Sequence, residues 1–242
     1  MNRRTLLKAS AAATAATAAP KGYVAVAAAE ERAAAEERSM AHWDEFIERS
    51  TALFDGVADK DAIDDDLFVH QLAGFASTLG DVPKADVFAN DGLGPGIRVG
   101  AIDTGRRRGF FLLRWELDPG AVLPAHNHPN YSFCTICRQG DVNVQNFEIV
   151  GAAPAYDSAT PFVVRKTQDQ EVFGGRINTL TRNRDNIHEL RAGPEGAVGM
   201  DIGILHTTDV GFSYLELEAL EIESGTYRAR WNRELTKRVR GA

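Results

Sequence analysis

Two histidines separated by one residue, His126 and His128, are the side chains of this sequence whose spacing best suits metal binding. In an extended strand, residues i and i+2 point to the same side, so both imidazoles can reach one ion through a ring nitrogen. Pro124 and Pro129 stiffen the backbone on either side of the pair. The pattern predicts part of a metal site on a short strand, although the same spacing also occurs by chance on surface strands.

A metal ion held by two histidines needs at least one further ligand. His188 is the best candidate, because it opens a short predicted strand after the polar turn at residues 184–186. His206 follows an apolar strand and is either a reserve ligand or a residue that contacts the ligands without binding the metal ion. His42 and His70 fall on predicted helical stripes, where packing or solvent exposure explains them.

Two helices are predicted in the part of the chain before these histidines. Residues 30–54 and 64–80 carry apolar side chains at three- and four-residue spacing, which predicts a helix in each range. We expect the second helix to bury Leu67, Phe68 and Leu72.

From Ile97 onward the chain consists of short apolar runs separated by Gly, Pro, Asn and Asp, a texture typical of antiparallel β structure. A closed barrel or jelly roll buries such strands without leaving exposed edges. We therefore expect an all-β jelly-roll barrel at residues 96–242, with the helical segment at residues 30–95 packed on it. The predicted strands are residues 110–117, 133–137, 142–150, 176–180, 187–191, 197–205 and 212–223.

The start of the chain is typical of a twin-arginine signal peptide. Arg3 and Arg4 precede an alanine- and threonine-rich run that ends near Ala29. A plain alanine-rich helix is the alternative, and the run is too short and too poor in large aliphatic residues to anchor the chain in a membrane. We expect export through the twin-arginine machinery to the periplasm or the cell exterior.

Loss of residues 1–29 would remove four cations and no anion, which changes the formal net charge from −7 to −11. An acidic domain argues against nucleic acid and anionic membrane surfaces as partners. The chain that remains is long enough for one domain with a substantial core.

Two cysteines, Cys134 and Cys137, form a C-x-x-C pattern inside a predicted strand. Residues i and i+3 of a strand point to opposite faces, which disfavours both a disulfide and a shared metal ion. We expect two buried cysteines, of which one lines the barrel.

The histidine pair is bracketed by Gly120, six residues before it, and Gly140, twelve residues after it. This arrangement resembles the first motif of the cupins, a family of small β-barrel proteins. Cupins usually carry a glutamate ligand five residues after the pair, but Phe133 occupies that position here. The missing carboxylate favours a site of three neutral imidazoles.

A three-histidine cupin with this layout resembles the thiol dioxygenases, and most of all the branch of cysteamine dioxygenase and the plant cysteine oxidases. The segment Leu123–Pro129 is similar to that branch's L-P-x-H-D-H-P, with Asn127 in place of the aspartate. Asn186-Ile187-His188 is similar to its G-N-I-H or D-N-L-H, and Met200–Leu205 is similar to its F-L-D-I-L. The three motifs occur in order within residues 97–223.

The resemblance implies that His126, His128 and His188 bind iron(II) and that Asp201 reaches toward the amine of the substrate. The substrates would be O2 and a small thiol or a peptide with an N-terminal cysteine, and the product would be a sulfinate. We expect Tyr214 to supply a phenol near the metal. The remaining candidate substrate contacts are Tyr131, Phe133 and His206.

The chemistry of three neutral ligands supports this expectation independently. Three imidazoles leave iron(II) with its full double positive charge, whereas a carboxylate ligand would cancel part of it. The site would therefore favour an anionic ligand, and metal coordination can deprotonate a thiol.

Two other functions remain open. One is a different cupin oxygenase, isomerase or hydrolase that uses iron, nickel or zinc to polarise a carbonyl or an enolate. The other is a non-catalytic exported cupin that binds a metal ion or a ligand. Asp201 separates them from the thiol dioxygenase, because strand alternation places it opposite Met200 and Ile202, either toward solvent or toward the cavity.

Overall fold

The computed structural model describes residues 42–57, 59, 62–83, 88–89, 93–102, 110–206, 211–221 and 224–240. The predicted signal peptide and residues 30–41 of the first predicted helix lie outside these ranges. The domain boundaries at residues 29 and 95 therefore stay predictions.

Three helices and ten strands make up the described structure. A first helix covers residues 42–55, and it is followed by α2 (Asp65–Ala76) and, near the end of the chain, α3 (Arg233–Arg240). The strands are β1 (Phe88–Ala89), β2 (Ile97–Ala101), β3 (Phe110–Leu117), β4 (Val122–Asn127), β5 (Tyr131–Val150), β6 (Phe162–Val172), β7 (Ile177–Leu180), β8 (Ile187–Leu205), β9 (Ser213–Glu221) and β10 (Thr226–Trp231).

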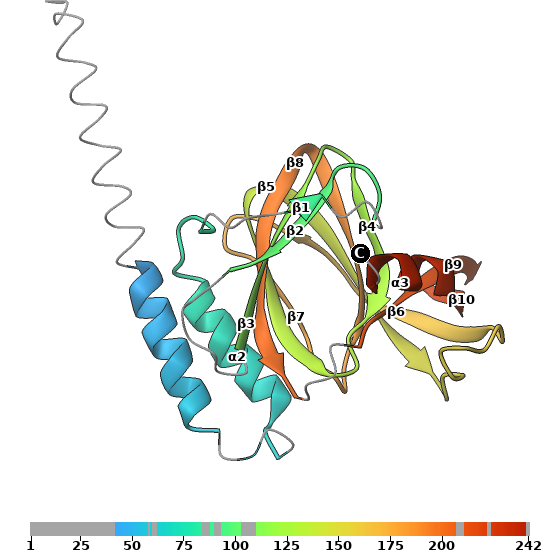
Figure 1. Cartoon of the computed structure of the whole chain (residues 1–242), viewed down its shortest axis with the longest axis horizontal. Helices are drawn as coiled ribbons and strands as arrows, with labels where there is room; N and C mark the ends of the chain where they lie inside the picture. Colours follow the sequence, from blue (N-terminus) through green and yellow to red (C-terminus); the bar gives the residue numbers. More distant parts are fainter. Residues whose placement is uncertain are drawn as a thin grey trace, which may run out of the picture. The chain divides into compact units, whose positions relative to one another are not determined.

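All ten strands belong to one sheet, in the order β1-β2-β3-β8-β4-β9-β10-β6-β5-β7. β5 and β8 lie far apart in this order, but they also pair with each other, and this pairing closes a barrel. Figure 1 shows the barrel with the first helix and α2 side by side on one flank and α3 on the other. The all-β cupin fold with N-terminal helices, expected from the sequence, is confirmed.

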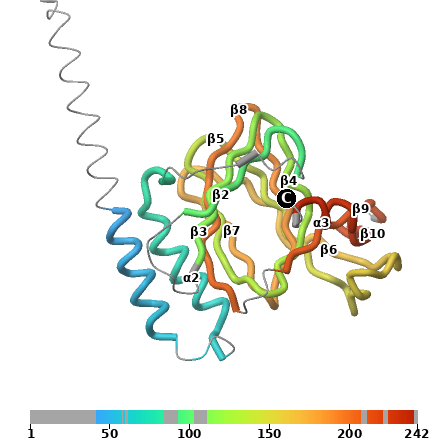
Figure 2. The backbone as a smooth tube through the Cα atoms, viewed as in Figure 1, coloured from blue at the N-terminus to red at the C-terminus, as the bar shows by residue number. Residues whose placement is uncertain are grey.

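The two longest strands, β5 and β8, pair antiparallel to each other, and Figure 2 shows them side by side. The sequence predicts each of them as two shorter strands, and this is wrong, because both continue through their glycines. Gly140 in β5 has a φ of 67°, and a Cβ there would lie 1.9 Å from the carbonyl oxygen of Gly196. Only glycine fits this close approach, so the residue marks a bend in a continuous strand rather than a loop.

The first helix and α2 cover the outer face of the barrel. Asp64 caps α2 by accepting a 3.0 Å hydrogen bond from the backbone N–H of Leu67. The predicted burial of Leu67 is wrong, because its side chain is 54% exposed. The residues that form the core under the helices include Phe46, Phe54, Phe68, Leu72, Leu112, Cys134, Ile136, Met200, Ile202 and Ile204.

The two cysteines lie in different cores, as the sequence predicts. Cys134 faces the helices, whereas Cys137 belongs to the cluster inside the barrel, with Trp115 and Leu190. Both thiols are free and buried, and burial raises the pKa of each, to about 11 for Cys137. Neither cysteine is therefore suited to metal binding or disulfide exchange.

Candidate metal centre and its cavity

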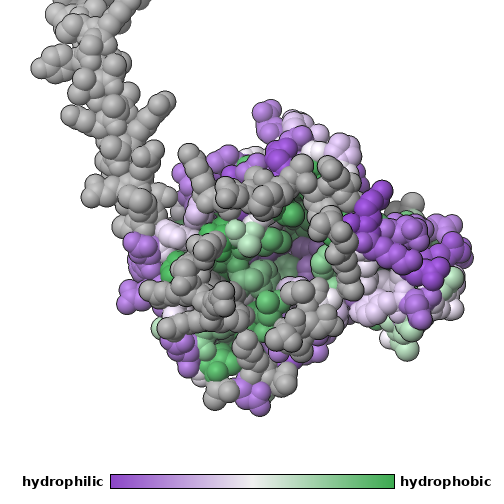
Figure 3. Space-filling model, viewed as in Figure 1, coloured by the Kyte–Doolittle hydropathy of each residue, from purple (hydrophilic) through white to green (hydrophobic). Residues whose placement is uncertain are grey.

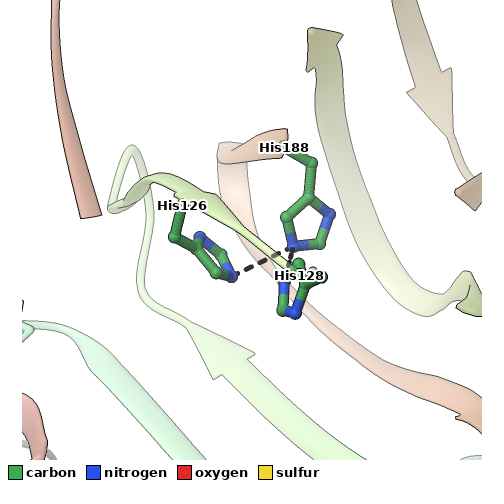
Figure 4. A group of neighbouring side chains, drawn as sticks. All are labelled: His126, His128 and His188. Atoms are coloured by element: carbon green, nitrogen blue, oxygen red, sulfur yellow. Dashed lines mark hydrogen bonds between the residues drawn. The ribbon is translucent and has the colours of Figure 1, made fainter. Parts of the chain in front are cut away.

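Three histidine side chains converge at one end of the barrel interior (Figure 4). His126 lies on β4 and faces His188 across the β4–β8 ladder, and His128 follows the end of β4. The Nε2 atom of His188 lies 3.1 Å from Nε2 of His126 and 3.1 Å from Nε2 of His128. Among the described residues, these three form a group whose potential ligand atoms all lie within 4.8 Å of one another.

The geometry of the three imidazoles fits a common metal ion. Two ring nitrogens about 2.1 Å from one ion, at a right angle to each other, would be about 3.0 Å apart. The Nδ1 atom of His126 lies 2.8 Å from the carbonyl oxygen of Pro124, which can only accept a hydrogen bond. Nδ1 therefore carries the proton, and the lone pair of Nε2 points at the centre of the group.

Burial also keeps the three rings neutral. It lowers the pKa of His126 to about 4 and the pKa values of His128 and His188 well below the ordinary range. The repulsion that a charge on a neighbouring ring would exert adds to this effect at His128 and His188. Neutral imidazoles are the form that binds metal ions, so protein folding prepares the group for a ligand role.

The strand that carries the histidine pair is fixed on its other face by Asn127. This side chain accepts a 2.7 Å hydrogen bond from the backbone N–H of Ser213 and donates a 3.1 Å bond to the hydroxyl of Tyr156. The backbone N–H of His128 donates to the carbonyl oxygen of Asn186 at 2.7 Å. The end of β4 is thus held between β8 and β9.

Aromatic rings surround the histidines. Phe133 makes edge-to-face contacts with His128 and His188, at ring-centre distances of 4.8 and 5.4 Å. Tyr131 lies 5.2 Å from His128, and Tyr214 lies 5.3 Å from His126. The position where cupins usually carry a carboxylate ligand is therefore filled by an apolar ring.

A cavity of about 370 Å³ opens beside His126 and His128. Figure 3 shows hydrophobic side chains gathered in a hollow at the middle of the face it displays. Such a lining favours a ligand with an apolar body and few polar groups. The described lining is formed by Leu93, Val99, Ala101, Phe111, Leu112, Leu113, Trp115, Leu123, His126, His128, Tyr131, Phe133, Asp201, Leu205, Phe212, Tyr214 and Val239.

Asp201 lies in this cavity, on β8, and is only 5% exposed. Its Oδ1 atom accepts hydrogen bonds from Thr135 Oγ1 at 2.7 Å and from Trp115 Nε1 at 3.2 Å. Burial raises the pKa of this carboxyl to about 7, although both hydrogen bonds lower it. Of the two orientations left open by the sequence, the structure has the one toward the cavity, while Met200 and Ile202 face the helices.

His206 is placed away from the cavity, on the face of the barrel covered by α2. Its Nε2 atom lies 2.9 Å from Ser132 Oγ and 3.3 Å from Asp65 Oδ1. It is neither in the three-histidine group nor in the described cavity lining. The expected role of His206 as a reserve ligand or substrate contact is therefore wrong. His42 and His70 are exposed on the helices.

Sequence reasoning missed the two donors that hold Asp201, Trp115 and Thr135. Thr135 is two residues from Phe133 on the same strand, so period-two alternation could have placed it inside the barrel. Trp115 gives no comparable signal, because its contact with Asp201 spans 86 residues of sequence.

Comparison with known proteins supports export. Residues 1–20 match the twin-arginine translocation pathway signal sequence, which indicates export across the membrane. No helix in the described part of the chain has the length and apolar character needed to span a bilayer. A search of curated proteins finds no match.

Several solved structures are similar in part. They include the 11S globulin from Wrightia tinctoria (15% identity, 54% of this chain and 29% of that chain, TM-score 0.38) and a recombinant oxalate oxidase in complex with glycolate (18% identity, 57% and 67%, TM-score 0.38). KdgF from Halomonas sp. is 16% identical over 51% of this chain and 89% of that chain, with a TM-score of 0.36. The chain spans less than a third of the globulin. Because these TM-scores are low, the fold assignment rests on the strand order of this structure. The three converging histidines indicate a metal-binding cupin.

Proposed function

We propose that this protein is an iron(II)-dependent dioxygenase that oxidises a thiol to a sulfinate. One thiol and one O2 give one sulfinic acid, so both oxygen atoms remain on sulfur and no external reductant is needed. His126, His128 and His188 would hold the iron, which would supply the redox chemistry between O2 and the thiol. The observation that carries the proposal is the ligand set, three neutral imidazoles with Phe133 in place of a carboxylate.

The ligand set matters because it leaves the charge of the metal uncompensated. A thiolate is the anionic substrate group best suited to such a site. The rings of Tyr131, Phe133 and Tyr214 lie beside the histidines and would limit the access of water to a bound metal ion. Burial raises the pKa of Tyr214, so its hydroxyl keeps its proton and is available as a hydrogen-bond donor to a bound substrate.

Asp201 would select thiols that carry an amine. Its hydrogen bonds come from two neutral groups, so the carboxylate has no cationic partner among those contacts. An ammonium group in the cavity would lower the pKa of Asp201 and form an ion pair shielded from water. This would orient an aminothiol with its sulfur toward the histidines.

The test is O2 consumption by the iron-loaded protein with cysteamine, with a peptide that has an N-terminal cysteine, and with 3-mercaptopropionate, which has no amine. We expect a sulfinate product, identified by mass as the gain of two oxygen atoms. Asp201→Asn should lower kcat/KM for the amine-bearing thiols about 10- to 100-fold, which corresponds to the loss of one charged hydrogen bond. Turnover of 3-mercaptopropionate should change less than about 3-fold.

Asp65→Asn is the matched control, because Asp65 is equally buried but lies outside the cavity. It should leave the ratio of the rates on the three thiols unchanged. Metal binding without O2 consumption on any thiol would favour a non-catalytic metal-binding cupin. Turnover of an enolate or carbonyl substrate instead would favour another cupin enzyme.

A further inference from the structure

Several buried polar atoms near the metal centre, Nδ1 of His128 among them, have no hydrogen-bond partner among the described residues, and two of them can satisfy each other. One is Nδ1 of His188, and the other is the side-chain oxygen Oδ1 of Asn146. Both residues are 0% exposed. A ring nitrogen that carries a proton and an amide oxygen that accepts one can satisfy each other.

The two residues are directly opposed on neighbouring strands. In the β5–β8 ladder, Asn146 pairs with His188, and the next pair on the same face is Val144 with Leu190. Val144 and Leu190 both belong to the core inside the barrel, so Asn146 and His188 face inward as well. The Cβ atoms of opposed residues on antiparallel strands are about 4.5–5.5 Å apart, within reach of both side chains.

The orientation of each side chain supports the pairing. The Asn146 amide nitrogen, Nδ2, donates to the carbonyl oxygen of Thr179 at 3.3 Å, which leaves the oxygen end as the free acceptor. In Figure 4 the second ring nitrogen of His188 points away from His126 and His128. Metal binding through Nε2 requires the proton to be on Nδ1, where it needs an acceptor.

We propose that Asn146 is a positioning residue of the metal centre, whose side-chain oxygen accepts the Nδ1 proton of His188 and thereby fixes the tautomer and orientation of that ligand. The inference rests on the proposed metal site and extends it beyond the three ligands. His126 already has such a partner, because Pro124 accepts its Nδ1 proton. The Asn146 side-chain oxygen would accept the Nδ1 proton of His188 on β8, as the carbonyl oxygen of Pro124 accepts that of His126 on β4.

The test is a titration of the metal-free protein with cobalt(II), whose absorption spectrum reports ligand geometry. Asn146→Leu removes the acceptor at similar volume and should weaken cobalt binding about 10- to 100-fold, the usual effect of losing the partner of a ligating histidine. Asn146→Asp keeps an acceptor and should bind within about 3-fold of the wild type. Thermal unfolding of the metal-free variants checks the fold, and Asn146→Ala replaces Asn146→Leu if the latter fails to fold.

Asn178→Leu is the matched control. Asn178 is also buried, at 1% exposure, and its Oδ1 also lacks a partner among the described residues, but it is opposed to Thr135 rather than to a histidine. Cobalt affinity and spectrum should be unchanged in this variant. In the zinc-loaded protein, the Nδ1 proton of His188 should give a slowly exchanging NMR signal that is present in the wild type and lost in Asn146→Leu.

The outcomes separate this inference from the metal site itself. Equal cobalt affinity in the wild type and Asn146→Leu, or equal weakening in Asn146→Leu and Asn178→Leu, overturns the role of Asn146 and leaves the metal site intact. Loss of affinity in Asn146→Asp as large as in Asn146→Leu also overturns it, because the acceptor is then not what matters. Failure of the wild type to bind cobalt overturns the metal site and this inference together.

Discussion

Asp201 and Asp65 are buried carboxylates on opposite faces of the barrel wall, and they are held in different ways. Asp65 lies in the first turn of α2, where its Oδ2 accepts hydrogen bonds from Arg182 Nε at 3.0 Å and from Asn183 Nδ2 at 3.3 Å. Its other oxygen lies 3.3 Å from His206 Nε2. Asp65 thus has a cationic partner, Arg182, which lies in the turn between β7 and β8.

Asp201 is buried to a similar extent, but it accepts hydrogen bonds from the neutral side chains of Trp115 and Thr135. A carboxylate with an arginine partner, such as Asp65, can hold two elements together, whereas a carboxylate held only by neutral donors can still attract a cation. Burial alone therefore does not distinguish a structural carboxylate from a functional one. The chemical nature of the donors does.

The largest expected effect comes from replacing a histidine by alanine, either inside the barrel or on the outer face under α2. His188→Ala should abolish metal retention after purification, since it removes one of the three ligands. His206→Ala should retain the metal ion and lose about 1–2 kcal/mol of unfolding free energy, because its contacts with Ser132 and Asp65 are lost. Metal analysis and chemical denaturation measure the two effects, and metal loss from His206→Ala alone would reverse the assignment of the faces.

A second effect is the pH dependence that Asp201 gives to the stability of the metal-free protein. Burial raises the pKa of Asp201 in the folded protein to about 7, above the ordinary value of 3.8 for an aspartate, so the folded state binds a proton more tightly than the unfolded state. Stability should therefore fall as pH rises from about 4 to about 7, by at most about 4 kcal/mol, and level off above that window.

Asp201→Asn should remove this dependence. Denaturant titrations of both proteins at several pH values between 4 and 8 provide the measurement, and the difference between the two unfolding free energies isolates the contribution of Asp201. A difference that stays constant across the window would show that folding does not raise the pKa of Asp201.

The smallest of the three effects concerns the helix face. Asp65→Ala should lower the unfolding free energy by about 2–3 kcal/mol, because it leaves the guanidinium of Arg182 without its carboxylate at a largely buried position. Cobalt affinity should not change. Weakened cobalt binding in this variant would indicate that Asp65 and the metal centre are coupled through the wall of the barrel.

The metal motif was predictable from sequence because it depends on local geometry. The spacing of His126 and His128 needs only an extended strand, and β3 has the bounds that the sequence predicts, residues 110–117. The orientation of Asp201 was not predictable. Helices cover the outside of β8, so apolar residues lie on both faces of this strand. The apolar residues Met200 and Ile202 therefore do not tell from sequence which face points into the barrel.

Three elements have no clear sequence signal at all. β6 and α3 consist largely of charged and polar residues, and β10 carries arginines between its inward-facing residues. Their stability comes from pairing and packing with distant segments, which local patterns do not contain. The partner of Asp201 on β3, Trp115, is hidden for the same reason.

The C-terminal helix forms part of the cavity wall, and this has a practical consequence for protein engineering. Val239 lines the cavity beside the histidines, and Leu235 packs in the core of the barrel. A fusion partner joined directly after α3 would start within a few residues of this wall. A polyhistidine tag there would add imidazoles that compete for the same metal ion, so metal content measured on such a fusion would count the tag together with the protein.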